Sequence, residues 1–446
     1  MRASTTVARI GAALRLLVTC TLLSCLLGAA ALTGAQRAPV PAAAVDPACA
    51  PRWAAAWHAA AQPAAADPPV VGRTLRMVVQ PQVTGSQVRV RLSNAYGGTP
   101  MTVGTASAGR SDGAAGVVPG TLAQLSFAGR PDAVLAPGAE LLSDPAPLVT
   151  VPGSPVAVSL FLPVAPDVLT EHDVALETSY LSGPGDAALD AAGTAYDTPV
   201  GSWLVLTGLE VLAPRPVNAV VAVGDSITDG VGSPTGTDER WSDALSRRLT
   251  AAGGGATMSV LNAGISANRL VPGAAPDDPP GLGPRGGDAP LARFDRDVVA
   301  AGASDVVLHI GTNDVAAGRS AAEIVDAMVA YTDRARAAGV RVVLTTITPS
   351  DSGAHGSRAA VRTREVVNAW VRAQGRAHAD AVADFAAAVA DPADPARLAP
   401  AFDSGDGLHL SAAGYRALAA VVDPAVLTGS PCLAGDPPAR VLVAGP

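Results

Sequence analysis

From about residue 74 to residue 213, hydrophobic and polar residues alternate in short runs that Gly and Pro separate. In residues 86–93, every second position from Val88 onward is Val or Leu, and Arg stands between them. Residues 155–163 show the same period of two residues, which is typical of β-strands. Short strands joined by turns, with little helical periodicity, predict an antiparallel β-sandwich domain over residues 49–213.

The pattern changes near Pro214-Arg215-Pro216, where we expect a domain boundary. Beyond it, short apolar runs alternate with segments of helical length. The predicted strands are residues 219–223, 259–261, 305–310, 340–346 and 381–385, and the predicted helices include residues 238–251, 321–338 and 411–422. This alternation predicts a parallel sheet with helices on both sides, in a domain that spans residues 217–428. Ligands of such sheets bind at the carboxyl ends of the strands.

The composition narrows the classes of protein that fit. The chain has 446 residues, of which 49% are hydrophobic and 16% are charged, so most of it is too apolar to be disordered. Its formal net charge of −8 and the lack of a basic patch argue against nucleic acid as a partner. The sequence contains no Lys. This excludes a Schiff-base lysine, a Ser-Lys dyad and the lysine of a Walker A motif.

The N-terminal sequence predicts export. An apolar run at residues 16–32 follows three Arg residues and precedes small residues, which is typical of a signal peptide over residues 1–35. The run is at the short end for a membrane span, so an uncleaved anchor is the lesser alternative. Residues 36–48 are rich in Ala and Pro and predict a flexible lead-in. We expect a secreted protein without stable membrane insertion after cleavage, and a C-terminal tail at residues 429–446.

The cysteines are consistent with an oxidising compartment. Signal cleavage would remove Cys20 and Cys25 and leave Cys49 and Cys432, one near each end of the mature chain. In such a compartment these two residues predict a disulfide, and two unpaired thiols are the alternative. The sequence has neither a CxxC pair nor an HExxH motif, so we expect no metal site.

Two motifs resemble functional sites but stand in the wrong context. Residues 109–113 fit the GxSxG nucleophile motif, but the sequence continues into Gly, Ala and Pro rather than into a helix. We therefore expect a surface turn there. Residues 281–286 fit GxGxxG, but they lie in a Pro-rich loop with no strand before it, which argues against a dinucleotide site.

A third candidate, Gly224-Asp225-Ser226, stands in the right context. It follows the predicted strand at residues 219–223, so the Ser226 hydroxyl would be exposed at the carboxyl end of the sheet. A serine hydroxyl is a poor nucleophile unless a base takes its proton, so this hypothesis requires a histidine.

Among the six histidines, His409 is the best candidate for that base. The other five lie in or before the first domain, in polar segments, or in the middle of a predicted strand: His58, His172, His355, His378 and His309. Asp406 stands three residues before His409, and a carboxylate there can orient the ring and stabilise imidazolium. A helix-capping Asp beside an incidental His is the alternative.

Acyl transfer also needs hydrogen-bond donors that face the developing oxyanion. Asn313 follows the predicted strand at residues 305–310, and its side-chain amide could donate. Gly264 follows the strand at residues 259–261, and its lack of a Cβ would let its N–H approach a substrate. Each residue alone also fits an ordinary turn at a strand end. Together with Ser226, they would meet at one edge of the sheet.

Four sequence blocks in this order resemble the SGNH hydrolases, the GDSL esterase/lipase superfamily. The blocks are Gly224-Asp225-Ser226-Ile227, the stretch Asn262-Ala263-Gly264, Gly311-Thr312-Asn313-Asp314, and Asp406-Gly407-Leu408-His409. The resemblance covers residues 219 to 422 and departs from the family only in Ile227, where Leu is usual. It implies a three-layer α/β/α flavodoxin-like domain with a parallel sheet. The β-rich segment before it is similar to that of two-domain secreted bacterial carbohydrate esterases.

The residues and the resemblance together predict a secreted serine esterase. Ser226 would be the nucleophile, His409 the base and Asp406 the residue that orients it, while the N–H groups of Ser226 and Gly264 and the Asn313 amide would form the oxyanion hole. No cofactor is implied. We expect short acyl groups on carbohydrate, including polysaccharide, or on other small esters. The alternatives are a lipase or phospholipase-type acyl hydrolase, an acyltransferase, and an inactive carbohydrate-binding protein.

Overall fold

The structure, a computed structural model, describes residues 47–65, 69–251, 258–273, 286–430 and 432. The predicted signal peptide at residues 1–35 and most of the predicted lead-in at residues 36–48 lie outside the described residues. The same holds for nearly all of the GxGxxG segment at residues 281–286 and for most of the predicted C-terminal tail. None of the helices in the described residues combines the length and the apolar character needed to cross a membrane.

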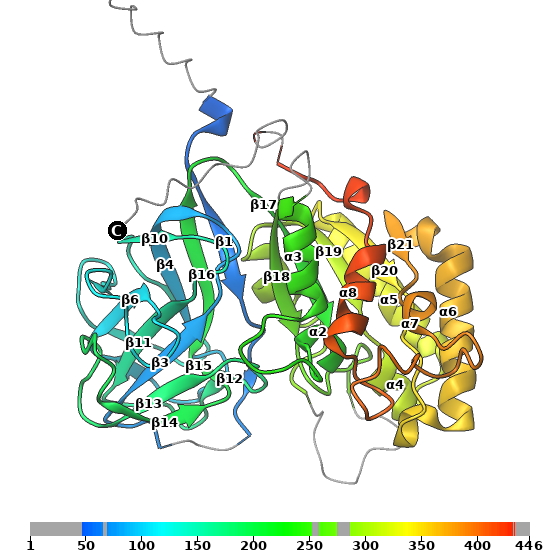
Figure 1. The fold of residues 1–446 in the computed structure, drawn as a ribbon, viewed down its shortest axis with the longest axis horizontal. Coiled ribbons are helices and arrows are strands. Elements are labelled where there is room, and N and C mark those ends of the chain that lie inside the picture. Colours follow the sequence, from blue (N-terminus) through cyan, green and yellow to red (C-terminus); the bar gives the residue numbers. More distant parts are fainter. Residues whose placement is uncertain (1–46, 66–68, 252–257, 274–285, 431, 433–446) are drawn as a thin grey trace, which may run out of the picture. The chain divides into compact units, whose positions relative to one another are not determined.

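The first part of the described chain, from residue 52 to residue 213, consists of β-strands (Figure 1). Its strands are β1 (Arg52–His58), β2 (Gln62–Pro63), β3 (Arg73–Val79), β4 (Gly85–Ser93), β5 (Met101–Val103), β6 (Ala106–Arg110), β7 (Ala123–Gln124), β8 (Ala133–Leu135), β9 (Glu140–Leu142), β10 (Ala146–Thr150), β11 (Val156–Leu162), β12 (Thr170–His172), β13 (Ser179–Pro184), β14 (Tyr196–Val200), β15 (Trp203–Leu204) and β16 (Leu206–Ala213). We call this part the β-rich region.

The strands of the β-rich region pair in antiparallel fashion. The two larger sheets have the strand orders β1-β16-β4-β10 and β14-β13-β3-β11-β6-β7. Val90 of β4, Leu160 of β11 and Leu209 of β16 belong to one hydrophobic core. The predicted antiparallel, strand-rich character is confirmed, and the arrangement of the sheets as a sandwich stays a prediction.

The second part contains a parallel sheet with the strand order β18-β17-β19-β20-β21. The strands are β17 (Asn218–Gly224), β18 (Met258–Gly264), β19 (Ala303–His309), β20 (Arg341–Thr345) and β21 (Ala381–Ala383). Gly224, the last residue of β17, pairs with Gly264 of β18 and with His309 of β19. The carboxyl ends of these three strands therefore lie side by side at one edge of the sheet.

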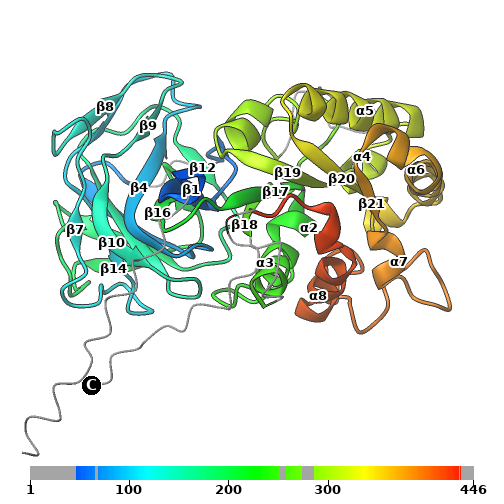
Figure 2. The same ribbon diagram turned by 90° about the horizontal axis from the view of Figure 1, so that it is seen from above.

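Helices cover both faces of this sheet (Figure 2). They are α2 (Ser226–Asp229), α3 (Trp241–Ala251), α4 (Thr312–Ala316), α5 (Ala321–Ala337), α6 (Arg358–His378), α7 (Phe385–Val389) and α8 (Ala412–Val421). Ile324 of α5 shares a core cluster with Val221 of β17, whereas Leu245 of α3 shares the other cluster with Val220. Neighbouring residues of β17 thus face opposite layers, which is why its sequence is apolar without a break.

The strands and helices that the sequence predicts in this part are all present, with shifted ends. The strand predicted at residues 259–261 extends over Met258–Gly264, and α3 begins at Trp241 rather than at residue 238. Helix α5 begins with a capping box, in which Ser320 and Glu323 each accept a hydrogen bond from the other residue's backbone. The long helix α6 was not among the predicted helices.

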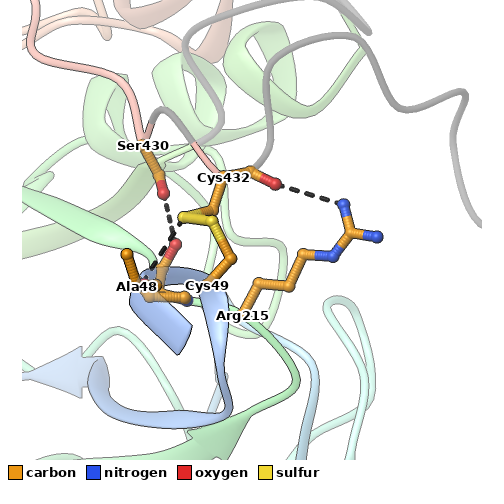
Figure 3. The surroundings of a disulfide bond; sticks show 6 residues. Ala48, Cys49, Arg215, Ser430 and Cys432 are labelled. Atoms are coloured by element: carbon orange, nitrogen blue, oxygen red, sulfur yellow. Dashed lines mark hydrogen bonds between the residues drawn. A yellow bond between two sulfur atoms is a disulfide. The ribbon is translucent and has the colours of Figure 1, made fainter. Parts of the chain in front are cut away.

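A disulfide joins Cys49 to Cys432, as the sequence predicts (Figure 3). It links the chain just before β1 to the segment that follows α8, so it connects two positions 383 residues apart. Arg215 donates a hydrogen bond of 3.1 Å to Cys432 O from the segment between β16 and β17. The start of the β-rich region, the predicted boundary and the end of the described chain are therefore held together at one place.

Candidate active site

Ser226 lies where strand β17 passes into helix α2. The Asp225 carboxylate caps the helix by accepting a hydrogen bond of 3.1 Å from Ile227 N. Ser226 is the first residue of α2, and the first N–H groups of a helix have no acceptor within it. A side chain at Gly224 would come within 2.2 Å of His309 O, so only glycine fits directly before this turn. The turn therefore presents both the hydroxyl and the N–H of Ser226 at the edge of the sheet.

The structure brings Ser226, His409 and Asp406 together. His409 Nε2 lies 3.0 Å from Ser226 Oγ, and His409 Nδ1 lies 2.6 Å from Asp406 Oδ2. Asp406 Oδ1 also accepts hydrogen bonds from the backbone N–H groups of Leu408 and His409, at 2.9 and 2.8 Å. The carboxylate thus fixes both the backbone turn before α8 and the ring of His409.

The charge of Asp406 sets the proton positions on His409. Burial raises the pKa of the Asp406 carboxyl, but hydrogen bonds from the His409 ring and from the backbone N–H groups of His409 and Leu408 lower the pKa overall. Asp406 is therefore ionised at neutral pH, and its carboxylate accepts a hydrogen bond from the N–H at Nδ1 of His409. This leaves Nε2 of the neutral ring free to take a proton from Ser226 Oγ. The arrangement can activate the hydroxyl as a nucleophile.

Asn313 lies in α4, directly after the end of β19. Its Nδ2 donates a hydrogen bond of 3.0 Å to Asn268 O, and His355 Nε2 lies 3.4 Å from its Oδ1. These two contacts orient the amide so that its NH₂ group faces the loop that follows β18. Burial is the main cause that lowers the pKa of His355, and the nearby His409 and Arg364 lower it further, so His355 is neutral at physiological pH. Sequence reasoning missed His355, and the one signal that could have found it is its position after the carboxyl end of β20.

The structure corrects the prediction for Gly264. Its N–H donates a hydrogen bond of 2.8 Å to Asn262 Oδ1, so this donor is already engaged. A Cβ at Gly264 would come within 2.3 Å of Asp229 N and would also collide with Thr228. The glycine is therefore required because α2 packs closely on the end of β18, and not because a substrate approaches it.

Ala267, and not Gly264, presents an open N–H group in the loop after β18. Its φ of 63° lies in the left-handed region, which alanine seldom adopts. Ala267 is exposed, and its N–H has no acceptor among the described residues. The neighbouring N–H groups are engaged, since Ser266 N donates to Asp229 Oδ2 and Asn268 N donates to Ile265 O, both at 3.0 Å. The loop therefore presents one unpaired donor beside Asn313.

Comparison with known proteins agrees with this geometry. The sequence model of the GDSL-like Lipase/Acylhydrolase family matches residues 222–417. These residues form a GDSL-like hydrolase domain. The match includes Ser226, Asn313, Asp406 and His409, and the chain is accordingly an ester hydrolase. A search of curated proteins found no significant match.

Two solved structures resemble about half of this chain. The lipase/acylhydrolase from Enterococcus faecalis is 22% identical, with a TM-score of 0.37, and the match covers 48% of this chain and 99% of that one. A GDSL-like lipase from Bacteroides thetaiotaomicron is 21% identical, with a TM-score of 0.36, and the match covers 47% of this chain and 90% of that one.

Two buried carboxylates of the GDSL-like domain hold the loop around Ala267. Asp229 Oδ2 accepts hydrogen bonds from Ser266 N at 3.0 Å and from Ser266 Oγ at 2.7 Å. Asp314 accepts hydrogen bonds of 2.9 Å from the N–H groups of Leu270 and Val271. The loop is thus fixed on both sides of Ala267, so the open N–H keeps one direction.

Of the four remaining histidines, His309 is a core residue, and His58 and His172 are contacts of the β-rich region, whereas His378 ends α6. His309 is buried, its Nδ1 lies 2.8 Å from Thr345 Oγ1, and burial lowers its pKa to about 3, which confirms the predicted core role. His172 and His58 come from the β-rich region, but they pair with carboxylates of the GDSL-like domain. His172 Nε2 lies 3.0 Å from Asp229 Oδ1, and His58 Nε2 lies 3.4 Å from Asp297 Oδ1. The sequence pattern of the β-rich region did not indicate these contacts.

The GxSxG segment at residues 109–113 does not form a nucleophile turn. Strand β6 ends at Arg110, and no helix begins in the described residues that follow it within the β-rich region. Ser111 Oγ accepts a hydrogen bond of 3.1 Å from Gly113 N, which is typical of a local turn. Within the described residues, no group of three or more His, Cys, Asp or Glu side chains is arranged to hold a metal ion.

Proposed function

We propose that this protein is a serine esterase that hydrolyses short-chain carboxylic esters through an acyl-enzyme. The observation that carries the proposal is the line of contacts from Asp406 through His409 to Ser226 Oγ, with distances of 2.6 and 3.0 Å. Both distances are within hydrogen-bond range for a nucleophile, its base and the group that orients the base.

In the first half of the reaction, Ser226 Oγ attacks the ester carbonyl carbon while its proton passes to His409 Nε2. The tetrahedral intermediate then collapses, and His409 returns the proton to the leaving alkoxide, which departs as the alcohol. In the second half, His409 takes a proton from a water molecule that attacks the acyl-enzyme. The carboxylic acid leaves, and the proton returns to Ser226 Oγ.

Three donors would stabilise the negative charge of the intermediates. We assign the N–H of Ser226, the N–H of Ala267 and the Nδ2 group of Asn313 to this role. The N–H of Ser226 belongs to the start of α2, and the N–H of Ala267 has no acceptor among the described residues. The Nδ2 group of Asn313 retains one N–H after it donates to Asn268 O. Donors that are fixed before the reaction lower the barrier without reorganisation at the transition state.

The side chains near these donors favour a small, polar ester over a lipid. Ser266, Asn313 and His355 lie around the Ala267 loop and the start of α4. A lipid substrate would be expected to bind at a continuous apolar surface. The exposed large apolar side chains of the described residues are scattered, and Leu291 is the nearest of them in sequence to this loop. Short acyl groups, on carbohydrate or on other alcohols, fit this surface best.

Secretion belongs to the same proposal. The disulfide between Cys49 and Cys432 supports it, because disulfides persist mainly in oxidising compartments. The chain begins with the predicted signal peptide at residues 1–35, so export would precede formation of the bond. Mass analysis of the protein from culture medium would test both the cleavage and the disulfide.

Hydrolysis of p-nitrophenyl esters of increasing chain length tests the substrate class. We expect the mature protein to cleave the acetate, with kcat/KM falling from the butyrate to the octanoate and beyond. A preference for long acyl chains would support a lipase instead. Acyl transfer to added glycerol in preference to water would support an acyltransferase, and inactivity of the folded protein toward every ester would support a binding protein.

The Asn313→Ala variant is expected to lower kcat for the acetate by roughly 10²- to 10³-fold, with KM changed little. The amide would contribute mainly in the transition state, when the charge on the carbonyl oxygen develops. Asn218→Ala is the matched control, since Asn218 donates to Thr428 O from the first residue of β17, at the other end of the strand. Equal kcat values for the two variants would contradict the assignment of Asn313.

A further inference from the structure

We propose that His172 of the β-rich region is a positioning residue of the active site, which holds the Ala267 loop in place through Asp229. This inference rests on the proposed function, because it concerns the N–H of Ala267 as an oxyanion donor. It gives the β-rich region a direct part in catalysis, beyond support of the fold.

The geometry forms one continuous chain of buried contacts. His172 ends strand β12, and Asp229 is the last residue of α2, three residues after Ser226. Asp229 uses one carboxylate oxygen for His172, at 3.0 Å, and the other for the N–H and Oγ of Ser266. His172 and Asp229 are 4% and 2% exposed, respectively. A shift of the Asp229 carboxylate would therefore move Ser266, and with it the next peptide group, whose N–H is that of Ala267.

The hydrogen-bond partners of His172 define its protonation state. Its Nδ1 lies 2.9 Å from Ala60 O, and its Nε2 lies 3.0 Å from Asp229 Oδ1. A carbonyl oxygen can only accept, so Nδ1 of His172 must donate to Ala60 O. When Asp229 is a carboxylate, its Oδ1 can also only accept, so Nε2 must donate as well. A neutral imidazole has only one N–H, and both contacts are therefore satisfied only by the imidazolium form.

The surroundings of the pair are polar enough to keep this charge. The ring of His172 stacks on Trp203 with 5.4 Å between centroids. Burial alone would lower the pKa of His172, and Arg240 also lowers it, but Asp229 and the hydrogen bonds to Asp229 and Ala60 O raise the pKa overall. The other titratable or charged groups that face the pair or line the cavity beside it include Arg240, Glu171, Tyr415, His58, Glu177, Asp238 and Asp243.

A pH dependence follows from this arrangement. The pKa of His172 is raised in the folded protein. The contribution of His172 to the stability of the folded state is therefore fully present below the ordinary pKa of a histidine and is lost as pH rises through the raised pKa. Above that pH, one of the two contacts of His172 is broken and Asp229 loses its charged partner. Activity should then fall at alkaline pH.

The test compares kcat, KM and the pH profile of p-nitrophenyl acetate hydrolysis for the full-length mature protein and for variants. We expect His172→Phe to lower kcat roughly 10- to 100-fold at neutral pH with KM nearly unchanged, because a displaced donor acts mainly in the transition state. His172→Gln keeps an N–H donor that does not titrate. It should recover most of kcat and lose the alkaline decline.

The Asp229→Asn variant provides a second test, which remains possible if His172→Phe does not fold. Its amide can donate to a neutral His172 and accept from Ser266, so it should also remove the alkaline decline. His378→Gln is the matched control, because His378 ends α6 and contacts Trp370, and its profile should equal that of the wild type. Thermal unfolding of each variant reports the folded fraction.

The outcomes separate this proposal from the proposed function. The role of His172 would be overturned if folded His172→Gln and Asp229→Asn both kept the kcat and the pH profile of the wild type. It would also be overturned if His172→Phe had a lower melting temperature but an unchanged kcat. Even if the role of His172 were overturned, an active wild type and an inactive Ser226→Ala variant would still support the proposed esterase. A folded wild type that cleaves no ester would overturn both proposals.

Discussion

Replacing Ser226 with alanine is expected to lower kcat for p-nitrophenyl acetate by roughly 10⁴- to 10⁶-fold, the largest loss of any single substitution in this chain. The variant has no hydroxyl for His409 to activate, so the acyl-enzyme cannot form. The backbone N–H of residue 226, the Ala267 loop and Asn313 would remain in place. Substrate should therefore still bind, and a slow reaction with water is the only route left.

Ser111→Ala is the matched control for this prediction. Ser111 is the serine of the GxSxG segment, and it is nearly as buried as Ser226, with exposures of 8% and 6%. A serine-directed fluorophosphonate should label the wild type and Ser111→Ala, but not Ser226→Ala. Full activity of Ser226→Ala, or loss of labelling in Ser111→Ala, would assign the nucleophile to the other motif.

The sequence was a good guide to those elements whose side chains follow a simple apolar pattern. Strand β17 is buried on both faces, and its uninterrupted run of Ala and Val predicted it directly. Helix α6 was missed because polar residues stand within its buried face. Arg364 donates to Ser350 O and Ala396 O, and Asn368 bonds to both the N–H and the carbonyl of Ile347. These partners belong to other segments, so the buried stripe looks polar in the sequence.

The candidate site shows a similar division between local and distant information. Asp406 and His409 are three residues apart, so their mutual contact could be predicted from spacing alone. The hydrogen-bond donor that follows the end of β18 could not be predicted from spacing. Gly264 was chosen because it is a glycine, but its N–H bonds to Asn262, and the unpaired N–H belongs to Ala267, whose positive φ has no signal in an alanine.

The contacts of the β-rich region with the hydrolase domain were also hidden in the sequence. His58 and Asp297 are far apart in the chain, and each taken alone resembles an ordinary polar residue. Strand β1, which ends at His58, contacts strand β18 of the parallel sheet, and His58 Nε2 lies 3.4 Å from Asp297 Oδ1. Arg293 then connects this contact with the active-site edge.

Arg293→Met is expected to reduce the free energy of unfolding by about 3–5 kcal/mol, because it leaves the carboxylate of Asp297 buried without its main partner. Arg293 is 1% exposed, and its Nη1 lies 2.5 Å from Asp297 Oδ2 and 2.8 Å from Ala263 O. Its Nη2 donates to Asn268 Oδ1 at 3.0 Å, beside the Ala267 loop. Activity of the remaining folded protein should therefore fall as well. Denaturant unfolding at neutral pH measures the first effect.

The pH dependence of this loss identifies its cause. Burial raises the pKa of Asp297, but Arg293 and His58 outweigh it and hold the pKa far below its usual range. In the wild type, this stabilisation is present above the ordinary pKa of an Asp and is lost as pH falls below about 4. In Arg293→Met, burial raises the pKa of Asp297, and protonation removes the unpaired charge. The difference between the two proteins should therefore shrink on acidification.

Two further variants distinguish a charge effect from a loss of packing. The double variant Arg293→Met/Asp297→Asn should recover part of the lost free energy of unfolding, since it removes the buried charge together with its partner. Arg334→Met breaks the exposed contact between Arg334 and Asp295 and should cost less than about 1 kcal/mol. A double variant as unstable as Arg293→Met, with the same loss at every pH, would mean that the packing of Arg293 matters more than its charge.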